Sequence, residues 1–433
     1  MSAVTASAAP ATMGPGRFRA FVGAKFVSDC ASSMDMVILS AYVFAATGEA
    51  LAVGLFLTAR LAATVVGSTL ASRIADRMPR RAILIAADLG RALGLFLFAL
   101  APAEWHPILF VPLAIVLGSC TGLFKVALYA EAPALRGYDQ RHAVNATFNA
   151  SEGVAEVVGG LSAAFVLALM SFKGVFLIDA ATYLVSALAL FLLMRGIGSA
   201  APAAALARIE AKAAPPVAPV PILALIRAVS IALPITFIAR GVEAFGSSAH
   251  NIGFPVFSAD FDPDNPAFLF GLIMAAWGAG RLVAAGAIPR ILAHPVIARD
   301  VFGLERVFLV GMILTFAMFL GVFATLVVPV VVFFAFAAGI FDASTEVAYY
   351  SSLQRAPAES RGRVIGVSYA LERMAMGLGM LATSAVLQVQ PLFETVAALY
   401  GVSVLIAAAL LVAMARLRRP GADGAEGPSA RDT

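Results

Sequence analysis

Long apolar segments dominate the chain and are separated by short polar turns. They occupy about residues 20–46, 50–74, 82–102, 108–130, 143–169, 174–195, 229–256, 267–289, 305–325, 327–350, 364–388 and 395–416. A bilayer core is crossed by about 20 apolar helical residues, so each segment is long enough to span it. Across the chain 61% of residues are hydrophobic and 13% are charged, about half the charged share of a soluble domain. The sequence therefore predicts an all-α membrane protein with twelve transmembrane helices.

The connection between the sixth and seventh segments divides them into two sets of six. Residues 196–228 are rich in alanine and proline and lack a helical period, which is typical of linkers. We therefore predict a bundle at 20–195, a cytoplasmic linker at 196–228 and a second bundle at 229–416. Residues 1–19 and 417–433 are predicted to be disordered.

Basic residues indicate the orientation, because short cytoplasmic loops of membrane proteins carry most of the arginine and lysine. If both termini are cytoplasmic, the segments on that side contain 22 basic residues and the outer loops contain one, Lys173. This bias predicts cytoplasmic termini. It also supports the number of spans, because a missed span would exchange the two sides.

One connection resembles a known signature. Residues 72–81 read SRIADRMPRR and resemble the loop G-x-x-x-D-R-x-G-R-R/K of the major facilitator superfamily. The matching residues are Asp76, Arg77, Arg80 and Arg81. Ser72 and Pro79 replace the two glycines. The resemblance implies two pseudo-symmetric six-helix bundles that rock around a central site, and a loop that holds one closed state as a conformational gate.

Other segments are similar to the branch of that superfamily that contains macrolide and siderophore (enterobactin-type) exporters. They are FLIDAATYLVSAL at 176–188, AADLGRALGL at 86–95, AAWGAGRLVAA at 275–285 and PAESRGRVIG at 357–366. Such exporters often carry a Gly-Pro…Gly-Gly signature in the fifth span. Here Gly159 and Gly160 are present, and Glu156 stands about where the proline would be. The resemblance implies a gradient-driven transporter of the bacterial cytoplasmic (inner) membrane.

Charged residues within the spans are the second notable feature, because each costs roughly 2.5–3.5 kcal/mol at the centre of a helix on insertion scales. On a helical wheel, the polar residues of the first span share one face: Lys25, Ser28, Asp29, Ser32 and Asp35. Four other spans have polar faces, formed by Thr121, Lys125 and Tyr129; by Asn145, Asn149, Glu152, Glu156 and Gly159; by Thr236, Arg240, Glu243, Ser247, His250 and Asn251; and by Asp342, Thr345, Glu346 and Tyr349. The first, fourth, seventh and tenth spans line the cavity in the superfamily that the chain resembles. We therefore predict that these faces line a cavity.

Acids outnumber bases deep within the spans. The acids are Asp29, Asp35, Glu152, Glu156, Glu243, Asp342, Glu346 and Glu372, and the bases are Lys25, Arg60, Lys125, Arg240, Arg281 and Arg373. One-to-one pairing leaves two acids without a base, and an unpaired buried carboxylate takes up a proton. Asp88, Arg91 and Asp179 are interpreted as structural residues near span ends.

Two sets of candidate site residues follow. The proton-coupling candidates are Asp35, Asp29, Glu152, Glu156, Asp342 and Glu346. The substrate-cavity candidates are Lys25, Ser32, Lys125, Tyr129, Asn149, Arg240, Glu243, Asn251, Tyr349 and Glu372. Asp35 has no base at i±3 or i±4, and we rank it first among the groups that titrate.

Several of these charges have a second, purely structural interpretation. Lys25 with Asp29, and Arg240 with Glu243, are spaced as ion pairs within one helix. Arg60 and Arg281 are interpreted as braces between helices. Glu372 and Arg373 point about 100° apart on a helix and are not expected to pair with each other.

These features favour a proton-coupled exporter of a polar or charged small molecule, such as a siderophore, an antibiotic or a drug. We expect a monomer in the bilayer that needs no cofactor beyond the proton gradient, no metal and no nucleic acid. An importer of a zwitterionic or cationic metabolite is the alternative, because sequence does not set the direction. An intramembrane enzyme built on Ser248 and His250 is disfavoured, since no independent base or nucleotide-binding loop accompanies them.

Ethidium accumulation in cells that express the protein tests these expectations. A proton-driven exporter that accepts cations lowers accumulation, and both Asp35→Asn and an uncoupler should restore it. Equal accumulation in all three cases would contradict export of cationic dyes and direct the search to more polar substrates.

Overall fold

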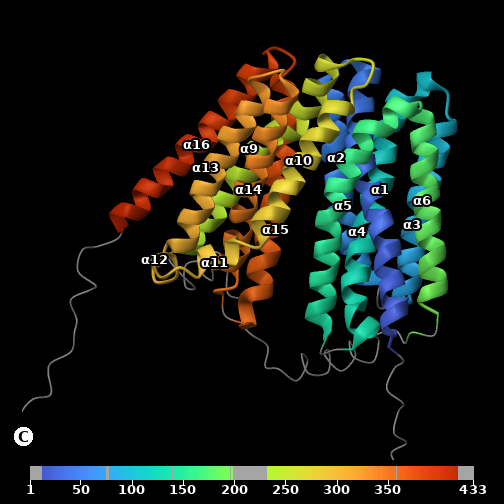
Figure 1. The fold of residues 1–433 in the computed structure, drawn as a ribbon, viewed down its shortest axis with the longest axis horizontal. Helices are drawn as coiled ribbons and strands as arrows, with labels where there is room; N and C mark the ends of the chain where they lie inside the picture. Colours follow the sequence, from blue (N-terminus) through green and yellow to red (C-terminus); the bar gives the residue numbers. More distant parts are fainter. Residues whose placement is uncertain are drawn as a thin grey trace, which may run out of the picture.

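The computed structural model describes residues 12–74, 78–137, 140–195, 197, 232–356 and 358–417. The long helices are α1 (Pro15–Thr47), α2 (Ala50–Ile74), α3 (Arg80–Leu100), α4 (His106–Arg136), α5 (Arg141–Leu169), α6 (Phe172–Leu193), α9 (Ala232–Phe261), α10 (Phe268–Ala285), α13 (Gly303–Phe323), α14 (Val328–Leu353), α15 (Ala358–Val386) and α16 (Leu392–Leu417). The short helices are η1 (Ala103–Trp105), α11 (Ile288–Leu292) and α12 (Pro295–Ala298). Short turns join them, and the described part of the chain contains no strand (Figure 1).

Eleven of the long helices have the length and hydropathy of membrane spans. The twelfth, α9, is 30 residues long, but its polar residues, among them Arg240, His250 and Asn251, lower its hydropathy. Large apolar side chains such as Leu93, Ile108 and Leu405 are exposed on the outer faces of the helices, where lipid covers them. The predicted all-α, multi-pass membrane protein is confirmed, and the long helices are consistent with the predicted number of spans.

The helices form two groups, α1–α6 and α9–α16 (Figure 1). Within the first group α2 packs on α4, α3 on α6 and α1 on α5; within the second, α13 and α10 pack on α14, and α9 on α15. The contacts between groups are made chiefly by α5 with α10 and by α2 with α15. The predicted linker lies outside the described residues, apart from residue 197.

One predicted boundary is wrong. The chain is ordered before residue 19, because α1 begins at Pro15, in the first turn of the helix where proline is well tolerated. Met13 is buried, and its backbone N–H donates to the Leu135 carbonyl at 2.8 Å. Phe21, about two turns further on, is also buried. This packing fixes the start of α1 against α4.

The two groups meet where small residues let their backbones approach. A Cβ atom built on Gly160 of α5 would lie 2.9 Å from the backbone nitrogen of Ala275 in α10. A Cβ atom on Gly54 of α2 would lie 2.6 Å from the Ser384 Cβ atom in α15. Both contacts lie in the halves of the helices that are nearer to the α1–α2 turn. The groups therefore converge at that end and diverge at the other (Figure 1).

We expect Gly160→Val to weaken the convergent end, because the larger side chain overpacks α5 against α10 at a cost of about 1–3 kcal/mol. Spin labels at Lys173 and Asp264, both exposed near this end, should then move apart in double electron–electron resonance. Gly401→Val is the control, since a Cβ atom there meets open space. An unchanged distance distribution in Gly160→Val would contradict this packing.

Candidate functional site

A central cavity lies between the two groups. Its first part, of about 270 Å³, is lined by α1, α2, α3, α4 and α5, and its second, of about 200 Å³, by α9, α10, α13, α14 and α15. Met36 and Met274 belong to the walls of both parts, so the two adjoin. The charged residues of the walls are Asp29, Arg60, Arg91, Lys125, Glu152 and Glu156 in the first part, and Arg240, Glu243, Arg281, Asp342, Glu346, Glu372 and Arg373 in the second.

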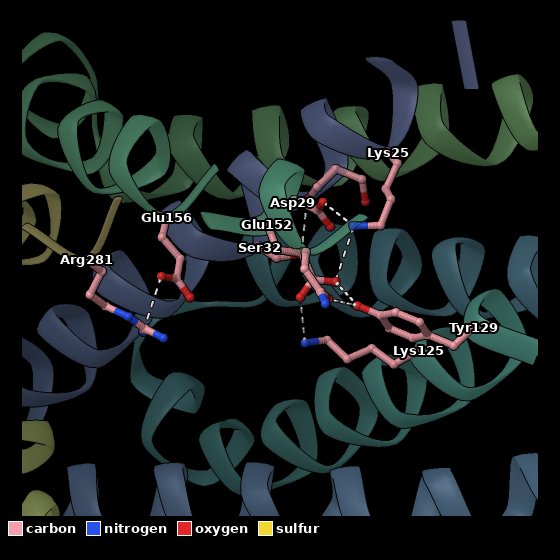
Figure 2. Close-up of polar contacts among 10 residues, drawn as sticks. Lys25, Asp29, Ser32, Lys125, Tyr129, Glu152, Glu156 and Arg281 are labelled. Atoms are coloured by element: carbon pink, nitrogen blue, oxygen red, sulfur yellow. Dashed lines mark hydrogen bonds and ion pairs between the residues drawn. The ribbon is translucent and has the colours of Figure 1, made fainter. Parts of the chain in front are cut away.

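Glu152 is the centre of a four-residue ion cluster in the first part (Figure 2). The Lys25 ammonium donates to Asp29 Oδ2 at 2.5 Å and to Glu152 Oε1 at 3.2 Å. Lys125 Nζ approaches the other Glu152 oxygen at 3.4 Å. The Lys25 side chain is 2% exposed, whereas that of Lys125 is 55% exposed. Lys25 is thus a fixed partner, and Lys125 is a partner that solvent or a ligand can replace.

Hydroxyl groups extend this cluster. The Tyr129 hydroxyl donates to Asn149 Oδ1 at 2.7 Å and lies 3.4 Å from Glu152 Oε1. Ser32, on the cavity wall, donates to the Ser28 carbonyl and shares a 2.9 Å hydrogen bond with Tyr183. The predicted polar faces of α1, α4 and α5 therefore meet at one place.

Arg240 is the centre of the second part. It lies 3.0–3.2 Å from carboxylate oxygens of Glu243, Glu346 and Glu372, which belong to α9, α14 and α15. Its guanidinium lies 4.5 Å from the ring centroid of Tyr349. Tyr349 is buried and shares a hydrogen bond with Ser368, so it supports Arg240 from behind.

Glu372 and Arg373 do pair, against the prediction, with 2.8 Å between Arg373 Nη2 and Glu372 Oε1. The two Cα–Cβ bonds diverge, but both side chains are long enough to reach around the helix. Arg373 is also held over the Tyr369 ring, at 4.9 Å. Direction at Cβ is therefore a poor guide to pairing for such long residues.

Arg281 of α10 connects the two groups across the cavity. Its Nη1 lies 3.6 Å from Glu156 Oε2 of α5, and its Nε lies 3.4 Å from Asp342 Oδ2 of α14. Figure 2 shows this pair apart from the Glu152 cluster. Glu156 is 39% exposed and Arg281 is 30% exposed, so water or a ligand reaches this contact.

Asp35 lies behind the cavity wall and not on it. Its carboxylate is enclosed and accepts a 2.7 Å hydrogen bond from Arg60 Nη2 of α2. The expectation that two acids lack a base is wrong for the eight acids counted, because Lys25, Arg240 and Arg281 each serve more than one. The buried carboxyl group without a basic partner in the described chain is instead Asp179, which the sequence analysis set aside.

The remaining candidates have clear positions. Asn251 lines the second part, and its Nδ2 donates to the Ser247 carbonyl. His250 shares a 3.0 Å hydrogen bond with Tyr400, and Ser248 one of 2.9 Å with Thr383. These separate partners give no serine–histidine contact within the described residues.

The predicted gate loop is described only in part, because Asp76 and Arg77 lie outside the described residues. The side chain of Asn145, on the predicted polar face of the fifth span, also lies outside them. Arg80 Nη1 donates to the Ala130 carbonyl at 2.7 Å and lies 3.4 Å from Glu131. Arg81 donates to the Phe191 carbonyl. Both arginines thus tie α3 to its own group, at the end where the groups diverge.

The sequence matches the family model of the Major Facilitator Superfamily over residues 21–299, more than half of the chain. The chain belongs to this superfamily. None of the curated proteins matches it.

Three similar solved structures are transporters. They are the nucleoside transporter NupG (16% identity, TM-score 0.69, 92% of this chain and 99% of that chain); a POT family transporter in complex with 5-aminolevulinic acid (13%, 0.65, 93% and 97%); and a bacterial homolog of the human lysosomal transporter Spinster in an inward-facing and occupied conformation (14%, 0.66, 92% and 96%). Such identities show a shared fold. Together with the family match, the fold indicates a transport role and not catalysis.

We expect Lys25→Met to destabilise the protein far more than Lys125→Met. Removing a buried partner leaves uncompensated carboxylates, at a cost of about 3–5 kcal/mol, whereas an exposed pair is worth about 0–1 kcal/mol. Thermal unfolding of detergent-purified protein measures both. Similar melting temperatures for the two variants would contradict the assignment of Lys25 as the fixed partner.

Proposed function

We propose that this protein is a proton-coupled exporter that moves a polar or charged small molecule across the bacterial cytoplasmic membrane by alternating access. One observation carries the proposal: a cavity rich in both charges lies between two helix groups that meet at one end. Its walls hold seven acids and six bases. A cavity for a hydrophobic drug needs few such groups.

The balance of charges favours a substrate with groups of both signs. Each charged side chain of the wall already has an oppositely charged partner. A ligand that separates such a pair must therefore supply a charge of the same sign as the partner it displaces. Lys125 is the most exposed partner of Glu152, and Arg281 is the exposed link between Glu156 and Asp342. An ammonium group can take the place of Lys125, and a carboxylate or phosphate can compete for Arg281. Binding of 5-aminolevulinic acid by a transporter of this fold supports an amino acid-like substrate.

The contact through Arg281 is our candidate for the element that couples substrate to conformation. It joins α5 of one group to α14 of the other through a single guanidinium. A substrate anion bound to Arg281 weakens this bridge and releases Glu156. The groups can then rotate about the glycine contacts at the convergent end.

Export is proposed from the similarity of residues 86–95, 176–188, 275–285 and 357–366 to siderophore and macrolide exporters. With cytoplasmic termini, as the basic residues predict, the divergent end faces the cytoplasm. The cavity then opens to the side from which an exporter loads its substrate. Protons entering from outside would drive the return, carried by carboxyl groups of the spans.

Proteoliposomes loaded with the pH dye pyranine test this proposal. Addition of 5-aminolevulinic acid, lysyl-alanine or ethidium should move protons in vesicles with the protein and not in empty ones. Glu152→Gln should lower the initial rate about tenfold or more, as expected for the loss of one charge-assisted contact.

Glu104→Gln is the matched control, because Glu104 is exposed in η1, outside the cavity. Its rate should equal that of the wild type. Proton movement in the same direction as the probe indicates symport, and movement in the opposite direction indicates antiport. A folded wild-type protein that moves no protons with any of the three probes would refute the proposal.

A further inference from the structure

A second charged cluster lies inside the first helix group, behind the cavity wall. It consists of Asp35 (α1), Arg60 (α2), Asp88 and Arg91 (α3) and Asp179 (α6). The three aspartates are 0–2% exposed and Arg91 is 4% exposed. Arg60 and Arg91 also line the cavity. The cluster is therefore closed to bulk water but adjoins the place where substrate would bind.

The two arginines of this cluster pair with two of its three aspartates, so one carboxyl group is left without a base in the cluster. Arg60 Nη2 lies 2.7 Å from Asp35 Oδ2, and Arg91 Nη2 lies 2.6 Å from Asp88 Oδ1. Neither oxygen of Asp179 accepts a hydrogen bond from a donor in the described chain, and Asp35 Oδ1 also lacks one. Asp88 Oδ2 also lacks a donor there, but its other oxygen is paired with Arg91. Asp179 is thus the member of the cluster with neither oxygen paired in the described chain, and Asp35 has one free oxygen.

The 2.9 Å hydrogen bond between Ser32 and Tyr183 fixes how α1 lies against α6. Asp35 is one turn after Ser32 and Asp179 one turn before Tyr183, and the two helices run in opposite directions. The two enclosed carboxyl groups are therefore side by side, where one can hydrogen-bond to the other once it carries a proton. Two ionised carboxylates cannot form this bond, because neither has a donor. One proton on the pair supplies the donor, and the resulting hydrogen bond engages one free oxygen of each group. The same solution is found in carboxylate dyads that share a proton because both cannot ionise at contact distance.

The charge of the whole cluster requires the same proton. Three ionised aspartates and two arginines carry a net charge of minus one, and one proton makes the sum zero. A charge without a partner at bilayer depth is costly. The hydrogen-bond pattern and the charge balance therefore lead separately to a single bound proton.

We propose that Asp35 and Asp179 form a carboxyl pair that binds one proton and serves as the coupling-ion site. This inference deepens the proposed function and rests on it for the coupling role. Asp179 thereby changes from a structural residue to a member of the proton site.

The pair communicates with the cavity through two routes. Arg60 contacts Asp35 and lines the cavity, so a substrate group that displaces Arg60 changes the charge balance of the pair. Ser32 lines the cavity and is hydrogen-bonded to the Tyr183 hydroxyl, and these two residues lie one helical turn from Asp35 and Asp179. When a substrate ammonium approaches Arg60, the added positive charge favours release of the proton to cavity water, which forms hydronium and leaves both carboxylates ionised.

Other titratable groups around the pair are engaged elsewhere. Cys120 of α4 packs against α3, where a Cβ atom on Gly90 would lie 2.8 Å from the Cys120 sulfur. Glu152 and Glu156 of α5 face the cavity, where Lys125 and Arg281 bind them. The charges of α9 and α10 lie on the far wall of the cavity. The proton balance of the pair is thus set mainly by Arg60 and Arg91.

Infrared spectroscopy of the full-length protein in lipid tests the proton directly and needs no substrate. At pH 7 the wild type should show a carbonyl band of a protonated carboxyl group that shifts on ¹³C-aspartate labelling. Both Asp179→Asn and Asp35→Asn should remove it, because either change leaves two arginines facing two aspartates. Asp264→Asn, in an exposed loop, should keep it.

Asp179→Asn is expected to fold, since its amide donates to Asp35 as the protonated acid does. Asp35→Asn tests the same charge count if it does not. A wild type without the band, or a band that survives in Asp179→Asn, would overturn the proposal.

Transport separates this proposal from the proposed function. With 5-aminolevulinic acid as probe, Asp179→Asn should lower proton movement about tenfold or more and keep exchange of labelled for unlabelled probe. Equal proton movement in wild type and Asp179→Asn refutes the coupling role and leaves the proposed function intact. A third outcome is also possible. If both variants lose the infrared band but no probe moves protons with the wild type, the proton pair is supported and the proposed function is refuted.

Discussion

A charge buried at membrane depth must be neutralised, and this requirement organises the interior of the protein. Bases are shared: Lys25 serves two carboxylates, and Arg240 serves three from three helices. Each shared base connects helices that are distant in the sequence. A movement of one helix therefore alters the neutralisation of charges on several others, which is what a rocking transporter requires of its binding site.

The buried charges fall into two sets, one on the cavity wall and one enclosed behind it. The cavity clusters around Glu152, Arg240 and Arg281 contain exposed members that a ligand can replace. The cluster of Asp35 and Asp179 is enclosed, so its charge can be balanced by a proton but hardly by a larger molecule. Arg60 belongs to both environments, and in the proposed mechanism it connects substrate binding to proton binding.

Sequence periodicity predicted the helices and their polar faces well, because the apolar length of a span and the wheel position of a side chain are local properties. It identified Lys25–Asp29 and Arg240–Glu243, whose partners lie within one helix. Partners on other helices, such as Arg60 for Asp35, depend on tertiary packing and were invisible. The importance of Asp179 was missed for the same reason: its lack of a base is a property of four packed helices.

Helix α9 has a further consequence, which concerns how the protein is made. It is the long helix that falls short of the hydropathy of a span, and Arg240 in its first third is neutralised partly by Glu346 and Glu372. These acids lie more than 100 residues later in the chain. When α9 leaves the ribosome, these two acids do not yet exist, and of the three acids that contact Arg240 only Glu243 of the same helix is present. We therefore expect stable insertion of α9 to depend on α14 and α15, and the second helix group to assemble as a unit and not one span at a time.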